Sequence, residues 1–312
     1  NTTTINAGTS TVTLKNKNAG VQIAVGGNDS GNTTLASRTL GLTNAEINRI
    51  SAGNLVIGSN TAGNTTVSAA TTTTATTGNL SLVSGGNITV NAALTVGDAA
   101  ATKNLTLNGA GTTSAISQTA AIKANNLELL GSNASYTLNN TSNDVSTLAA
   151  NVKSMAYTDA TALTIGTVNS TTGITATGDI SVKTATGDLT LSQNIATNNA
   201  NTVNLEAASA IAQTAGTISA GTLNLKAGTT IGSSSNRVHT SVSNLSLNSA
   251  GDQYITEADS VNVSGQTTSN GNIDIATTDG TLGVGASVNS IVGLSASGTG
   301  NISLTGYATG NT

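Results

Sequence analysis

The fold is decided by the stretch Val203-Asn204-Leu205, which returns as Leu223-Asn224-Leu225 and again as Leu245-Ser246-Leu247. In each copy two aliphatic side chains flank a polar one, which is the period of a short strand with one buried and one wet face. The first residues of the copies are 20 and then 22 residues apart. Two or three short strands per step, repeated at this interval, predict the coils of a solenoid.

The same alternation recurs along the chain, each time after a turn-forming residue. Such copies begin at Asn79, Asn87, Asn104, Asp179, Asp188, Asn244, Asn272 and Asn301. Asn and Asp form the bends because they tolerate left-handed backbone geometry and hydrogen-bond to nearby backbone. The chain has no proline, so no strand is prevented from pairing on both sides.

These features predict an all-β fold, a right-handed parallel β-helix (β-solenoid). Coils of roughly 20–22 residues would give about 15 coils. We expect one continuous solenoid over residues 1–312, as a fragment of a longer protein.

The composition fits a thin aliphatic core and excludes several classes of function. The chain has no Phe, Trp or Cys, and charged residues make up 8% with a net charge of −4. Lys and Arg do not cluster, so nucleic acid is not an expected partner. No apolar run approaches the roughly 20 residues that span a bilayer.

Three segments interrupt the strand pattern. Residues 42–50 predict one or two helical turns, with Thr43 and Glu46 at the spacing of a capping box. Residues 146–153 are interpreted as a wide bend. The threonine-rich residues 71–77 fit either an outward loop or a polar strand.

Three stretches resemble the repeats of a known family. They are residues 40–58 (LGLTNAEINRISAGNLVIG), residues 147–152 (TLAANV) with 157–166 (YTDATALTIG), and residues 231–236 (IGSSSN) with 242–245 (VSNL). These resemble repeats of large two-partner-secreted exoproteins, the filamentous-haemagglutinin-like adhesins. The resemblance is spread over roughly residues 40 to 265.

This resemblance implies a long β-helical shaft, secretion through an outer-membrane transporter, and attachment to host or neighbouring cells. The secretion domain of the family carries an Asn-Pro-Asn type motif, and this chain has no proline. The chain would therefore be the repetitive shaft region, extracellular at a bacterial cell surface. Exposed terminal ladders also predict end-to-end stacking of copies into a filament. The shaft repeats carry no functional residue that could be assigned.

Metal and catalytic sites have little support in the sequence. His239 is the only histidine, and without a second imidazole or a thiol we expect no metal site and no cofactor. It is interpreted as a solvated loop residue, and no Gly-x-Ser-x-Gly elbow supplies a nucleophile for a triad. Asp179 and Asp188 are nine residues apart, and residues 26–31 (GGNDSG) resemble a calcium loop. Neither continues as a series, so both aspartates are interpreted as bends.

Two other functions of β-helices have specific requirements. A carbohydrate-binding or carbohydrate-cleaving β-helix of tailspike type needs clustered carboxylates or exposed aromatics on one face. The densest acidic group is Asp252, Glu257 and Asp259, and the available aromatics are Tyr136, Tyr157, Tyr254 and Tyr307. Ice binding needs a regular threonine array, but the pairs at 11/13, 175/177 and 184/186 do not recur at the coil period. We therefore predict a structural stalk that is not an enzyme and has no catalytic, cofactor-binding or metal residues.

Overall fold

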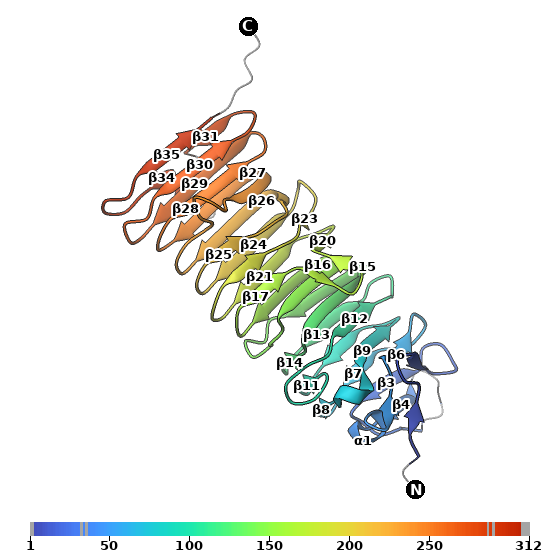
Figure 1. Ribbon diagram of the computed structural model, residues 1–312. Coiled ribbons are helices and arrows are strands. Elements are labelled where there is room, and N and C mark those ends of the chain that lie inside the picture. Colours follow the sequence, from blue (N-terminus) through green and yellow to red (C-terminus); the bar gives the residue numbers. More distant parts are fainter. Residues whose placement is uncertain (1–2, 32–33, 35–36, 286, 289–290, 307–312) are drawn as a thin grey trace. The chain divides into compact units, whose positions relative to one another are not determined.

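The computed structural model describes residues 3–31, 34, 37–285, 287–288 and 291–306. Parallel strands stack along the chain and form a β-solenoid of about ten turns, with almost no helix (Figure 1). The all-β solenoid prediction is therefore confirmed, while its right-handed sense stays a prediction. The chain divides into two compact units, the first made of residues 1–159 with 168–171 and the second of residues 160–167 with 172–312.

The first unit contains sixteen strands, one short α-helix and one 3-10 turn among its described elements. They are β1 (Ile5–Asn6), β2 (Thr11–Leu14), β3 (Gln22–Val25), β4 (Thr39–Leu42), α1 (Asn44–Ile47), β5 (Ile50–Ser51), β6 (Asn54–Ser59), β7 (Thr65–Val67), β8 (Thr71–Thr72), η2 (Ala75–Thr77), β9 (Asn79–Ser84), β10 (Ile88–Val90), β11 (Leu94–Thr95), β12 (Leu105–Gly109), β13 (Ala115–Gln118), β14 (Ile122–Lys123), β15 (Asn126–Leu138) and β16 (Thr147–Asp159).

The remaining strands follow in the same manner. They are β17 (Leu163–Ile165), β18 (Thr167–Val168), β19 (Thr171–Thr172), β20 (Ile174–Ala176), β21 (Ile180–Thr184), β22 (Leu189–Leu191), β23 (Ile195–Ala196), β24 (Thr202–Ala207), β25 (Ile211–Gln213), β26 (Ile218–Ala227), β27 (Val238–Ser249), β28 (Gln253–Glu257), β29 (Val261–Thr267), β30 (Ile273–Thr277), β31 (Leu282–Val284), β32 (Ser287–Val288), β33 (Ile291–Val292), β34 (Leu294–Ser295) and β35 (Ile302–Thr305).

The core of each unit is a set of columns in which an aliphatic side chain lies on its equivalent in the next coil. In the second unit Val203 pairs with Leu223, and Leu223 pairs with Leu245. These are the steps of 20 and 22 residues that the sequence predicted. All three side chains are buried, so each coil is stabilised through its neighbours.

The number of turns is lower than the predicted 15 because the coils differ in length. In the first unit Val12 pairs with Leu55, so one step takes 43 residues and includes β3, β4 and α1. The following step from Leu55 to Leu80 takes 25 residues. A single period read from residues 203–247 therefore overestimates the number of coils in the chain.

The bends are held by a ladder of side-chain oxygens. The Oδ1 atom of a bend Asn or Asp accepts the backbone N–H of a residue in the next coil, as Asn79 does from Asn104 at 3.0 Å and Asn272 from Asn301 at 2.9 Å. Asp179 and Asp188 do the same for the N–H groups of Thr202 and Ala210, both at 2.9 Å. Both aspartates thus have the hydrogen-bonding role expected of bend residues.

The predicted helical turn is confirmed and the predicted wide bend is wrong. Helix α1 begins after Thr43, which forms a capping box with Glu46. Residues 146–153, by contrast, belong mostly to β16, a strand of 13 residues that pairs with β15. The alternation is hidden there because Leu148, Ala149 and Ala150 are all buried.

Ala149 is buried because this part of the outer face is covered. Its register partner Glu128 is also buried, although it lies between two inward leucines of β15. Asn169 Nδ2 and Thr171 Oγ1 donate hydrogen bonds to the Glu128 carboxylate, at 2.8 and 2.7 Å. Residues 168–171 of the first unit therefore lie over these outward positions.

Residues 71–77 combine both structures that the sequence allowed. Thr71 and Thr72 form β8, and residues 75–77 form the turn η2. Thr71, Thr73 and Thr77 are buried, and the Thr73 hydroxyl accepts the N–H of Gly97 at 2.8 Å. None of the described helices is long and apolar enough to span a membrane.

Candidate functional site

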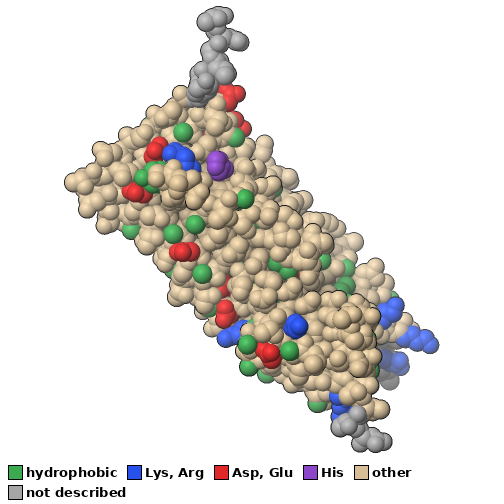
Figure 2. Space-filling view, in the orientation of Figure 1, with side chains coloured by type: hydrophobic (Ala, Val, Ile, Leu, Met, Phe, Trp, Pro, Cys, Tyr) green, Lys and Arg blue, Asp and Glu red, His purple; other side chains and the backbone are tan. Residues whose placement is uncertain are grey.

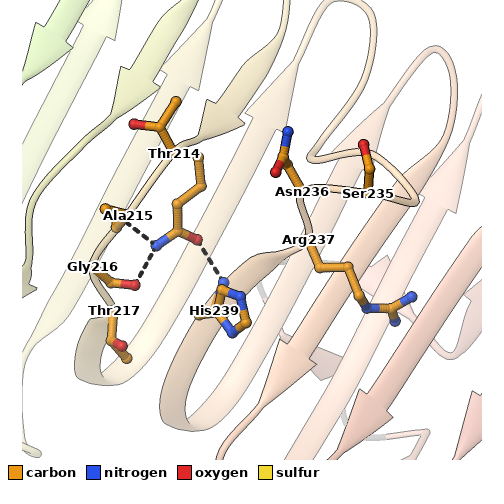
Figure 3. Close-up of a pocket in the computed structure, with 9 residues that line it drawn as sticks. Thr214, Ala215, Gly216, Thr217, Ser235, Asn236, Arg237 and His239 are labelled. Atoms are coloured by element: carbon orange, nitrogen blue, oxygen red, sulfur yellow. Dashed lines mark hydrogen bonds between the residues drawn. The ribbon is translucent and has the colours of Figure 1, made fainter.

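A recess of about 380 Å³ opens on the second unit between the segment after β25 and the segment before β27 (Figure 3). It is lined by Gln213, Thr214, Ala215, Gly216, Thr217, Ser235, Asn236, Arg237 and His239. The lining is polar, and apart from His239 none of these residues stands out in the sequence as a candidate for chemistry.

The buried amide of Gln213 organises this recess (Figure 3). Its Nε2 donates to the carbonyls of Ala215 and Gly216, at 3.2 and 2.7 Å. Its Oε1 accepts the backbone N–H of His239 at 2.6 Å. Because both ends of the amide are used within the protein, Gln213 joins two coils and is not available to a ligand.

His239 lies in strand β27, not in the loop that the sequence suggested. Val238 and Thr240 on either side are buried, so alternation leaves the imidazole of His239 exposed at the recess. The expectation that His239 is solvated is confirmed. Within the described part of the chain, no three His, Cys, Asp or Glu side chains gather as a metal site would require.

Arg237 lies beside this recess and contacts neighbouring strands of the second unit. Its guanidinium forms an ion pair with Asp274 at 3.1 Å and lies 5.9 Å from the ring centroid of Tyr254. Nη2 also donates to the carbonyl of Ile255 at 2.7 Å, and Nε donates to the hydroxyl of Thr256 at 3.0 Å. The charge of Arg237 is thus already compensated, which leaves little of it for an anionic ligand.

The acidic residues near Tyr254 do not converge on one point. Glu257 points into the interior, where its carboxylate accepts hydrogen bonds from the hydroxyl of Thr240 and the N–H of Val242. Burial raises the pKa of Glu257 above its ordinary value. Asp252 accepts the N–H of Asn272 at 2.7 Å as a bend residue, and Asp259 is exposed.

The calcium-like segment at residues 26–31 has the same role as the bends. Asp29 Oδ1 accepts the backbone N–H of Gly41 at 2.8 Å. With Asp179 and Asp188 also engaged by backbone N–H groups, these three carboxylates stabilise contacts between coils.

The tyrosines do not form an exposed stack in the described residues. Tyr136 and Tyr157 are buried, and their hydroxyl groups donate to the carbonyl of Leu107 at 2.8 Å and to Asp159 at 2.7 Å. Burial raises the pKa of both phenols. Tyr254 is partly exposed beside Arg237, and Tyr307 lies outside the described residues.

The threonine pairs do not line up into an array. Thr175 has Ala196 as its register partner in the next coil. Thr184 is buried and donates to the carbonyl of Gly187 at 3.1 Å. The face in Figure 2 shows scattered acidic and basic side chains among uncharged polar ones.

Comparison of the chain with protein-family models, with curated proteins and with solved structures found no match. The chemistry of the polar recess therefore follows from its geometry alone. It offers hydroxyl and carbonyl groups and one imidazole, which suit a small polar molecule or water.

Proposed function

We propose that the chain is a shaft segment of a secreted bacterial surface adhesin, of the filamentous-haemagglutinin-like kind that its repeats resemble. The observation that carries this proposal is the register of the core columns, such as Val203 with Leu223 and Leu245. Coils that depend only on their neighbours can be added in number without a change of fold. Such a scaffold suits a spacer that projects a binding end from a cell.

The proposed setting is extracellular, at a bacterial cell surface, after export through an outer-membrane transporter. The partners are then the surface of a host or neighbouring cell and further copies of the same shaft, stacked end to end. Strand β35 supports the stacking, because Ile302 and Leu304 are 45% and 42% exposed and occupy inward register positions opposite Ile273 and Ile275. An edge of this kind favours addition of another strand.

The number of coils is the property to test. The full chain is displayed on a non-adhesive bacterium with a peptide tag at its outer end, and cells are captured under flow by antibody against the tag. One variant carries a second copy of residues 203–244, inserted in phase after Asn244. We expect it to fold, to lengthen the particle by about 10 Å in X-ray scattering, and to keep or increase capture.

The matched control inserts residues 203–234 at the same place, which adds a similar length but shifts the coil register. We expect this variant to unfold locally and to lose capture, because its inward positions no longer meet. Equal capture by both variants would show that the chain acts as a flexible tether. Release of sugars from a bacterial polysaccharide by the purified chain would instead identify an enzyme, and the shaft proposal would be wrong.

A further inference from the structure

A short hairpin, made of strands β32 and β33, leaves the solenoid near the end of the second unit. Strand β31 pairs with the first half of β29, from Val261 to Val263, and β34 resumes the pairing at Gly265. Between them β32 and β33 pair with each other in antiparallel fashion. This excursion departs from the parallel ladder at the position where a partner for Ser264 would lie.

The hairpin covers part of the outer face. Strands β32 and β33 pack against β29, and β32 also packs against β27. Ser246 and Ser264 lie at outward positions between buried aliphatic residues, yet they are only 2% and 0% exposed. Beside the hairpin is a recess of about 310 Å³. Its lining consists of Asn224, Leu225, Lys226, Ser246, Asn248, Gln266 and Ile291.

One polar atom of this recess has no partner. The Nδ2 atom of Asn224 donates to Asn204 Oδ1 at 2.7 Å, which fixes the orientation of the amide. Its Oδ1 atom is buried and accepts no hydrogen bond. A buried acceptor without a donor is unfavourable, so a donor bound in the recess would be stabilised there.

The charges beside the recess are already paired. Lys226 Nζ lies 3.1 Å from Glu206 Oε1, and the same carboxylate oxygen pairs with Lys183 at 3.2 Å. An anion would compete with Glu206 for the ammonium group. An apolar molecule would leave the amides of Asn248 and Gln266 without partners. A neutral molecule with several hydroxyl groups can both donate and accept here, and Ile291 offers it an apolar contact.

We propose that this recess is a binding subsite for one neutral sugar ring of a glycan. A volume of about 310 Å³ is at the small end of the range for ligand sites and restricts the occupant to roughly one ring. Asn224 Oδ1 accepts a sugar hydroxyl, while Asn248, Gln266 and Ser246 supply further hydrogen bonds. The site gives the shaft a weak glycan contact along its side, in addition to its role as a spacer.

The test is a titration of the full ¹⁵N-labelled chain with glucose, galactose, mannose, N-acetylglucosamine and glucuronate, followed by NMR. For at least one neutral sugar we expect shifts of the side-chain amide signals of Asn224 and Gln266. A one-ring ligand predicts a dissociation constant on the order of 1 mM. Gln266→Ala and Asn248→Ala should each weaken binding roughly fivefold, since each removes a hydrogen bond.

The matched control is His239→Ala, which alters the other recess of the second unit and should leave the affinity unchanged. A crystal soaked in the sugar should show it in contact with Asn224 Oδ1. Water alone on that atom, shifts with glucuronate only, or unchanged binding by the Gln266 and Asn248 variants would each overturn the proposal. None of these results bears on the coil-duplication test of the shaft.

Discussion

Replacing Arg237 with alanine removes a guanidinium group that connects three successive segments of the second unit. The side chain precedes β27, donates to the carbonyl of Ile255 in β28 and forms an ion pair with Asp274 in β30. Nη2 also donates to the carbonyl of Asp274 at 2.9 Å. We therefore expect the variant to destabilise the second unit locally.

The size of the effect follows from the exposure of the pair. The side chains of Arg237 and Asp274 are 21% and 32% exposed, so solvent screens their attraction and the ion pair contributes about 0.5–1 kcal/mol. The hydrogen bonds to the two carbonyls add about 0.5 kcal/mol each, because water replaces part of what is lost. Arg237→Ala should cost about 2 kcal/mol. Arg237→Lys keeps the charge without the planar fork and should cost about 1 kcal/mol.

Urea unfolding followed by circular dichroism, together with hydrogen exchange of amides in β28 and β30, measures this loss. A double-mutant cycle with Asp274→Ala should give a coupling energy of about 0.5–1 kcal/mol. His239→Ala is the neighbouring control and should change the free energy of unfolding by less than about 0.5 kcal/mol. If Arg237→Ala were no more destabilising than this control, the view that Arg237 joins these segments would be wrong.

Three further substitutions test the core, the bends and the buried carboxylate. Leu225→Ala should lower the free energy of unfolding by about 2–5 kcal/mol, measured by urea unfolding, since a fully buried column loses packing. Asp188→Ala should cost about 1 kcal/mol while Asp188→Asn stays close to wild type in the same assay, because only the oxygen that accepts from Ala210 matters; a calcium-dependent melting temperature lost in both variants would contradict this. The pKa of Glu257 is raised above its ordinary 4.5 by burial, so the folded chain binds more protons than the unfolded chain between 4.5 and the folded pKa. Stability from this group therefore falls as the pH rises through that window, and the gain from Glu257→Gln should grow with pH in unfolding titrations; a gain independent of pH would refute the assignment.

The parts of the fold that could be predicted are those in which local pattern and tertiary position agree. Val203, Leu223 and Leu245 lie on one column because alternation and coil spacing both point there. The turn at α1 was readable because Thr43 and Glu46 satisfy the helix start with their own side chains. In these cases the information needed lies within a few residues or one coil.

The parts that could not be predicted depend on segments that fold over the outer face. Ala149 and Ser264 are outward by pattern but buried, because residues 168–171 and the hairpin of β32 and β33 are placed by tertiary packing. The buried Tyr136, however, left a readable signal: it alternates with Ala134 and Leu138, both of them inward. Its hydroxyl reaches the carbonyl of Leu107, which allows a tyrosine in a column of aliphatic residues.

The bend ladder explains why acidic residues in this chain are poor guides to chemistry. A bend needs one side-chain oxygen for the N–H of the next coil, and Asp252 and Asn272 provide it equally, at 2.7 and 2.9 Å. Spacings such as that between Asp179 and Asp188 then follow from strand length and not from a ligand. Binding chemistry is better sought where the coil is interrupted, because an excursion such as the hairpin of β32 and β33 encloses outward polar groups that a regular coil leaves in water. The unpaired oxygen of Asn224 lies at such a place.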